Sequence, residues 1–118
     1  ALTVFRLRRA DGSALWAGGS WRPAGGAVQV FDEGSVVFTA VRYWTSPRSG
    51  ARYPVQWRVE TPAGRFEVRA LADDQELDSS ASTGAIYWEG LSDLHDAKGQ
   101  SVGRGYLEMT GYARALRL

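Results

Sequence analysis

Apolar and polar residues alternate over short stretches of the chain, and turn-forming residues separate these stretches. Side chains that alternate in this way point to opposite faces of a β-strand, and helical periodicity is hard to find. The alternation predicts strands at about residues 2–9, 14–22, 27–32, 35–44, 54–61, 65–72, 84–93 and 101–111. Most connections are short and contain glycine, which is typical of hairpins between antiparallel neighbours.

These strands predict an all-β fold, an antiparallel up-and-down barrel of about eight strands. Closing a sheet into a barrel removes the two exposed edges that an open sheet would leave. The interior of a barrel of this size is filled by side chains or holds one small ligand, as in lipocalins. A two-sheet sandwich would show similar alternation, so it stays open as an alternative.

Composition places the whole chain, residues 1–118, in a single domain, because 118 residues with 44% hydrophobic suffice for one core. A net charge of +1 lacks the basic excess of proteins that bind nucleic acids or anionic membranes, and no apolar run is long enough to span a bilayer. Cys is absent and His95 is the single histidine, which excludes disulfides, thiolate metal sites and paired-imidazole sites. We therefore expect no cofactor, no metal site, no nucleic-acid partner and no membrane span.

Two carboxylates near the end of the chain are the candidate catalytic residues. Glu89 shares a strand face with Tyr87, and Glu108 shares one with Tyr106, because side chains repeat with a period of two. If these two strands pair, both carboxylates lie side by side. They then form either a solvated face with arginine partners such as Arg104, or a polar lumen in which burial raises one carboxyl pKa and creates a general acid.

Aromatic residues form the second group of candidates. Most are expected in the core, but a lumen lined by some of them would favour an apolar or polyene ligand. Tyr43 and Trp44 lead into the longer connection 45–53, which places them near a barrel mouth. The other long connection, 72–83, is acidic, but the spacing of its carboxylates is not that of a calcium-binding loop. The candidate ligand-binding residues are Tyr43, Trp44, Trp57, Tyr87, Trp88 and Tyr106.

Several motifs in one order resemble a known family. They are RYWTSP (residues 42–47), ARYP (51–54), DQEL (74–77), YWEG (87–90) and GRGYLEMTGY (103–112). Together they are similar to the C-terminal part of the AttH proteins, within the hydroxyneurosporene synthase (carotenoid 1,2-hydratase) superfamily. The resemblance covers most of the chain, from Leu2 to Ala113.

The resemblance implies two lipocalin-like barrels, of which this chain is chiefly the second. Its first residue is not Met, so we expect a piece of a longer protein whose partner is an N-terminal barrel or a second copy. Members with known activity act on hydrophobic small molecules, and carotenoid hydratases add water across an acyclic carotenoid end. The AttH branch is usually exported, which implies a secreted, periplasmic or cell-envelope bacterial protein.

Three functions follow from these observations. The first is a noncatalytic module that binds a hydrophobic small molecule such as a terpenoid or polyene. The alternative is an enzyme of the hydratase/lyase or isomerase type, with Glu89 or Glu108 as the acid. Trp88 and Glu89 are adjacent, so without a bulge they cannot both line one lumen. The third is a barrel filled by its own aromatic residues. An apolar cavity with an inward carboxylate would favour the enzyme. A cavity without an inward carboxylate would favour the binding module, and the absence of a cavity would favour the filled barrel.

Overall fold

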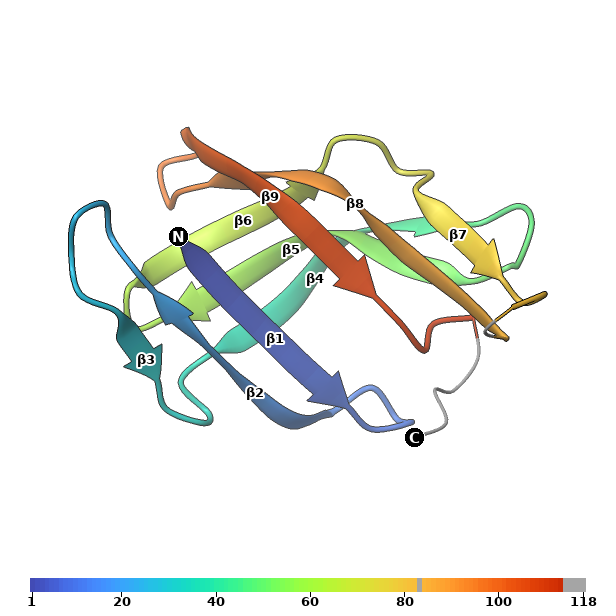
Figure 1. Cartoon of the computed structure of the whole chain (residues 1–118), viewed down its shortest axis with the longest axis horizontal. Helices are drawn as coiled ribbons and strands as arrows, with labels where there is room; N and C mark the ends of the chain where they lie inside the picture. Colours follow the sequence, from blue (N-terminus) through green and yellow to red (C-terminus); the bar gives the residue numbers. More distant parts are fainter. Residues whose placement is uncertain (83, 114–118) are drawn as a thin grey trace.

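Antiparallel strands joined by turns make up the computed structural model, which describes residues 1–82 and 84–113 (Figure 1). The described residues form nine strands and no helix, which confirms the all-β prediction. The strands are β1 (Leu2–Arg8), β2 (Ala14–Trp21), β3 (Gln29–Phe31), β4 (Val37–Thr45), β5 (Arg52–Thr61), β6 (Gly64–Ala70), β7 (Glu76–Ser79), β8 (Ala85–His95) and β9 (Ser101–Met109). No helix able to cross a membrane occurs in this part of the chain.

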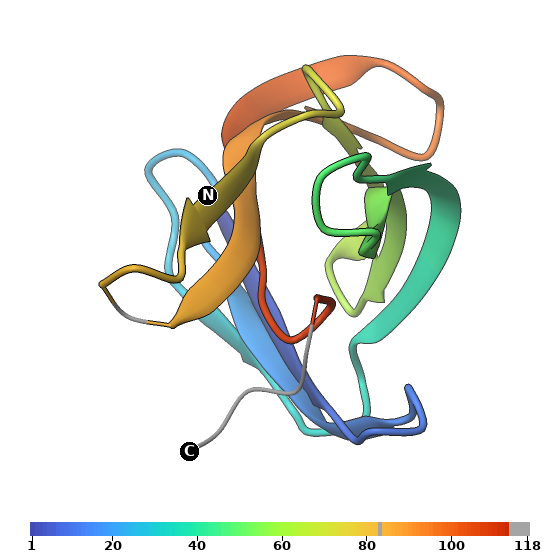
Figure 2. The same cartoon turned by 90° about the vertical axis from the view of Figure 1, so that its right-hand side faces the viewer.

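The strands belong to two sheets that curve around a common interior (Figure 2). One sheet has the order β1-β2-β3, and the other contains the remaining six strands. Strand β9 pairs along one edge of β8, while β6 and β7 share its other edge. Among the described residues, no ladder joins β1 to β9 or β3 to β4. This arrangement is compatible with the expected lipocalin-like fold, although hydrogen bonding does not close it into one continuous barrel.

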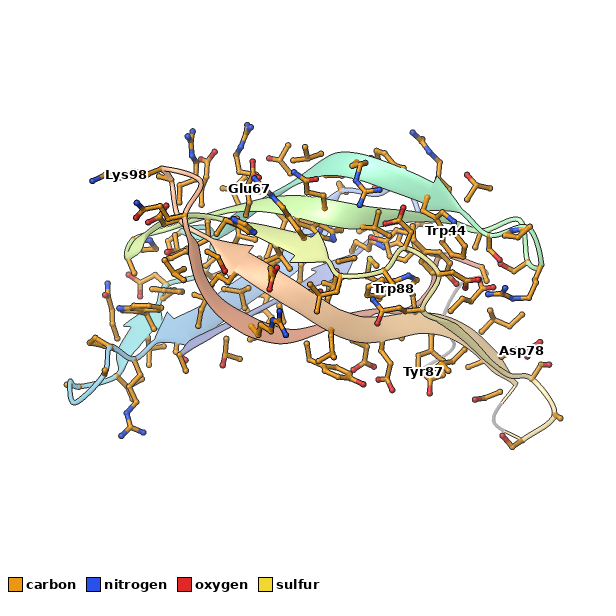
Figure 3. The ribbon with its side chains drawn as sticks, turned by 90° about the horizontal axis from the view of Figure 1, so that it is seen from above. Trp44, Glu67, Asp78, Tyr87, Trp88 and Lys98 are labelled. Atoms are coloured by element: carbon orange, nitrogen blue, oxygen red, sulfur yellow. The ribbon has the colours of Figure 1, made fainter. Side chains whose placement is uncertain are left out.

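The core lies between the sheets and is built from alternate positions of their strands. In β8, Trp88 is fully buried while the adjacent Tyr87 is only half-buried, and Figure 3 shows these two side chains on opposite sides of the strand. Trp57 of β5 pairs with Val68 of β6, which pairs with Leu94 of β8, so these three residues share the inward face. The alternation that predicted the strands therefore also separates interior from surface.

The segment 72–83 differs from its prediction as a long loop, because it contains the short strand β7. Leu77 is the single apolar residue of this strand, so hydrophobic alternation gives no signal for it. β7 forms because Glu76 to Ser79 pair with residues 85–88 of β8. The segment 45–53, also expected as a loop, contains the first two residues of β5, which begins at Arg52.

Gln75 fills the gap between β6 and β7 along the edge of β8. Its side-chain oxygen accepts a hydrogen bond from the Leu91 backbone N–H (3.1 Å), and its side-chain nitrogen donates to the Ala72 carbonyl (2.8 Å). A Cβ atom at position 90 would lie 2.0 Å from that oxygen. Gly90, the last residue of YWEG, is therefore the position at which the Gln75 amide lies against the β8 backbone.

Candidate functional site

A cleft separates the edges of β1 and β9, the first and last strands, which run side by side in Figure 1. Its volume is about 430 Å³, within the range of pockets that bind small molecules. We call it the β1–β9 cleft. It is lined by Ala1, Leu2, Thr3, Val4, Trp21, Val68, Ser92, Asp93, Leu94, Val102, Gly103, Arg104, Gly105 and Tyr106.

Two glycines of β9 leave the floor of this cleft without side chains. Gly103 pairs with Leu94 and Gly105 with Ser92, so both glycines share the inward face of the sheet. A Cβ atom built on either glycine would meet no atom within 4 Å. Residues 101–106 are consequently exposed on both faces of β9, whereas Met109 at the far end of the strand is buried. The open space exists because the sequence places glycine at two successive inward positions.

Ser92 places a buried polar atom beneath the floor of the cleft. The residue is 2% exposed, and its hydroxyl oxygen has no hydrogen-bond partner within the described part of the chain. Buried hydroxyl groups are normally paired, because an unpaired one loses its hydrogen bonds to water. The cleft is lined mainly by apolar atoms, and the unpaired Ser92 hydroxyl lies buried beneath this lining.

The rim of the cleft carries charged and aromatic residues. Arg104 and Asp93 pair across β8 and β9, with 3.2 Å between the guanidinium Nε and the carboxylate oxygen. Tyr106 is 67% exposed and lies on the same side of β9 as Arg104. These groups form a polar border around the mainly apolar interior of the cleft.

At the other end of the molecule, the carboxylate of Glu76 is surrounded by hydroxyl groups, although its side chain is only 3% exposed. Ser46 donates to one oxygen (2.6 Å), and Ser49 and Tyr53 donate to the other (2.6 and 2.8 Å). The Arg48 guanidinium lies 3.6 Å from the same carboxylate. We call Ser46, Ser49, Tyr53 and Glu76 the Glu76 clamp. It fastens the segment before β5 onto β7.

Burial raises the pKa of Glu76, but the hydrogen bonds from Ser46, Ser49 and Tyr53 and the Arg48 charge outweigh burial and hold this pKa below its usual value. Burial and the hydrogen bond to Glu76 raise the pKa of the Tyr53 hydroxyl. Glu76 is therefore an ionised acceptor and Tyr53 a neutral donor at neutral pH. The clamp and the adjacent Arg48 thus supply hydrogen bonds and a positive charge to the carboxylate.

Two exposed ion pairs reinforce the same junction. Arg42 binds Asp73 through two hydrogen bonds (2.8 and 2.9 Å), and Arg48 binds Asp74 in the same way (2.9 and 2.5 Å). The indole N–H of Trp88 donates to the Asp73 carbonyl (2.7 Å). One network thus joins four of the motifs: RYWTSP, ARYP, DQEL and YWEG. Asp73 and Asp74 each form an ion pair with an arginine in this network.

The predicted catalytic residues Glu89 and Glu108 are brought together as expected, since they are directly opposite in the β8–β9 ladder. Both lie on the outward face, because their neighbours Trp88 and Met109 are buried on the inward one. Glu89 is half-buried and Glu108 is exposed. Arg104, considered as a partner for these carboxylates, pairs with Asp93 instead. A catalytic role for either glutamate stays a prediction.

The structure distributes the six predicted aromatic ligand residues over several places. Trp57 and Trp88 are core residues, whereas Tyr43 is exposed on β4 with the Arg52 guanidinium 3.7 Å from its ring centre. Trp44 is half-buried and stacks on Tyr53. Tyr87 lies on the outward face, and Tyr106 is the one member of the set that lines the β1–β9 cleft. Ligand binding by these residues stays a prediction.

Sequence reasoning did not single out the cleft residues Leu2, Val4, Ser92, Gly103 and Gly105. A signal was nevertheless present in the two glycines, because glycine inside a strand often marks a close approach of a ligand or another backbone. A second signal was the serine at position 92, between apolar inward positions of β8. Neither signal shows which face is inward without the pairing of the sheets.

Comparison with known proteins gives one consistent result. A family model described as AttH-like matches residues 1–112. Among solved structures, the chain is similar to a crystal structure at 2.00 Å resolution of a Nitrosomonas europaea protein provisionally assigned as AttH, with 45% identity and a TM-score of 0.89. The match covers 94% of this chain and 34% of the other, so the chain spans about a third of that protein's length. Comparison with curated proteins finds no significant match.

Proposed function

The chain belongs to the AttH-like family, and on this premise we propose that it binds a hydrophobic small molecule in the β1–β9 cleft. The ligand class is terpenoid, polyene or similar, and the chain by itself binds without catalysing a reaction. The observation that carries the proposal is an open apolar cleft of about 430 Å³ between two strand edges.

The chemistry of the cleft wall supports a binding function. Leu2, Val4, Val68 and Leu94 provide apolar surface, and burying such surface stabilises a complex by about 25 cal/mol per Å² before the costs of association. The charged groups of Asp93 and Arg104 add polar contacts at its border. This combination is typical of small-molecule pockets.

The alternative function, hydration of an alkene by a carboxylic acid, receives less support. Such an acid must reach the substrate within hydrogen-bonding distance, and in an apolar site its pKa would be raised. Glu89 and Glu108 lie on the face of the sheet opposite the cleft. Asp93 at the rim is paired with Arg104. Binding therefore explains the arrangement with fewer assumptions than catalysis does.

We also propose that a further β domain of the same protein packs against this one. The outward face of the small sheet supports this proposal, since it exposes Phe5, Leu7, Trp16 and Val30. The match to only 34% of the related chain supports it as well, because that protein contains much additional sequence. An uncovered aromatic surface of this kind often marks a protein interface.

Filling the cleft floor tests the binding proposal. The probe is the neutral dye N-phenyl-1-naphthylamine, titrated by fluorescence. We expect Gly105→Leu to weaken dye binding by at least about tenfold, because its side chain occupies the open space above β9. Thr39→Leu, which adds the same side chain at an exposed position of β4, is the control and leaves affinity within about twofold. The proposal is wrong if the wild type does not bind the dye, or if Gly105→Leu binds it as well as the control.

A further inference from the structure

Arg6 is an inward-facing cation that has no anionic partner. In β1 the residues Leu2, Val4, Arg6 and Arg8 are half-buried and alternate with exposed ones, so all four point toward the interior. None of the carboxylates in the described residues lies within ion-pair distance of the Arg6 guanidinium. A half-buried charge without a partner is unusual, because charge removed from water is normally paired.

Aromatic rings support the Arg6 side chain without using its hydrogen-bond donors. Its guanidinium carbon lies 5.1 Å from the centre of the Trp57 ring and 5.7 Å from that of Phe38. An aromatic ring has no acceptor oxygen or nitrogen lone pair in this contact, so the guanidinium N–H groups gain no hydrogen-bond acceptor from it. The indole N–H of Trp57 is also buried without a partner in the described part of the chain. This region therefore contains N–H donors that have no acceptor among the described residues.

The position of Arg6 along β1 connects it to the β1–β9 cleft. Leu2 and Val4 line the cleft, and Arg6 is the next inward position, about 7 Å further along the strand. Arg8 is the next inward position after Arg6, with its guanidinium 3.7 Å from the centre of the Tyr112 ring. Within β1, Arg6 is thus the first cation beyond the apolar positions Leu2 and Val4.

We propose that the cleft selects single-chain anionic amphiphiles, with a carboxylate bound by Arg6 and the hydrocarbon chain along Leu2, Val4 and Leu94. This inference rests on the proposed binding function and specifies the ligand class of the same site. A carboxylate matches the planar donor pattern of one guanidinium through two parallel hydrogen bonds. Its single negative charge also balances the single unpaired charge of Arg6.

The test compares two ligands that share a ten-carbon chain, decanoate and decanol, by displacement of N-phenyl-1-naphthylamine at neutral pH. We expect the wild type to bind decanoate at least about tenfold more tightly than decanol. Arg6→Gln should remove this preference while leaving decanol affinity within about twofold. Arg6→Lys, which keeps the charge, should retain a preference for decanoate. Arg65→Gln, at an exposed outward position of β6, is the control and should behave as the wild type.

The outcomes separate the two proposals. Equal binding of decanoate and decanol by the wild type overturns the role of the carboxylate but leaves the binding function standing. This comparison needs no variant, so it holds even if Arg6→Gln does not fold. A preference that persists in folded Arg6→Gln overturns the assignment of Arg6. Failure of the wild type to bind the dye or either ligand overturns the binding function and this inference with it.

Discussion

Two serines of this protein are equally buried but lie in opposite chemical surroundings. Ser46, in the Glu76 clamp, is 1% exposed, donates to Glu76 and accepts hydrogen bonds from the backbone N–H groups of residues 48 and 49. Ser92, in the β1–β9 cleft, is 2% exposed and has no partner in the described residues. The difference separates a region in which a buried hydroxyl is paired internally from one in which a buried hydroxyl is left unpaired.

The same contrast holds for the charges of the two regions. The arginines near the clamp, Arg42 and Arg48, each bind an aspartate through two hydrogen bonds, whereas Arg6 near the cleft rests on aromatic rings alone. A region with complete internal pairing holds the fold in one conformation. A region with unpaired donors beside open apolar space is where binding a ligand would recover lost hydrogen bonds.

The largest expected effect comes from removing the centre of the clamp. Glu76→Ala should lower the free energy of unfolding by about 3–5 kcal/mol, because three hydroxyl groups, those of the buried Ser46 and Tyr53 and of the half-buried Ser49, lose their acceptor together. Denaturant unfolding measures the loss, and Glu60→Ala, at an exposed position of β5, is the control with a small effect. A loss below about 1 kcal/mol for Glu76→Ala would mean that the clamp contributes little to stability.

The two serines provide a matched pair for the next effect. Ser46→Ala should cost about 1–3 kcal/mol of unfolding free energy, since it leaves buried partners unpaired. Ser92→Ala should stay within about 0.5 kcal/mol of the wild type or increase stability, because it removes a hydroxyl that has no partner. Urea unfolding of both variants checks the comparison. Equal losses at the two positions would contradict the distinction between the two regions.

The clamp also predicts how stability depends on pH. The pKa of Glu76 is lowered on folding, so its contribution is present above the unfolded pKa and is lost as pH falls through the folded value, in the window below about 4.5. The pKa of Tyr53 is raised, so stability falls as pH rises above about 10, where the unfolded chain releases the proton first. Unfolding measured across pH should show a shallower acid decline in Glu76→Gln and a shallower alkaline decline in Tyr53→Phe. Unchanged declines would place the titration elsewhere.

The smallest expected effect lies on the outward face, where the carboxylates of Glu89 and Glu108 are directly opposite in the ladder. Like charges in such a pair destabilise a sheet, so Glu108→Gln should raise the free energy of unfolding by about 0.5 kcal/mol. Because Glu108 is exposed, the gain should fall in 1 M salt, which screens the repulsion. A loss of stability instead would show that Glu108 has a favourable partner.

Local sequence patterns predicted most of the strands and the connections between them. Alternation located the strands, and short connections that contain glycine located the hairpins; in the connection between β1 and β2, Gly12 has a φ of 90°. The pairing of Glu89 with Glu108 also followed from two strands joined by a short turn. Strand β7 could not be predicted, because pairing with β8 rather than hydrophobic alternation makes it a strand.

The candidate site was harder to predict from the sequence than the fold, because its residues depend on which face of each strand points inward. In β8 both faces carry an aromatic residue, Tyr87 or Trp88, so composition does not distinguish them. The Glu76 clamp joins residues 23 to 30 positions apart, and no local pattern encodes such contacts. The cleft likewise depends on two strand edges from opposite ends of the chain, β1 and β9.

The contact between Gln75 and Gly90 limits which substitutions either position accepts. The side-chain amide of Gln75 replaces a missing strand residue beside β8, and the space it occupies exists only because position 90 has no Cβ atom. A larger residue at 90 would expel the amide and leave the Leu91 N–H without its acceptor, while a shorter residue at 75 would leave a gap over the glycine. A change at either position therefore alters the contact made by the other, which couples a residue of the DQEL segment to the last residue of YWEG.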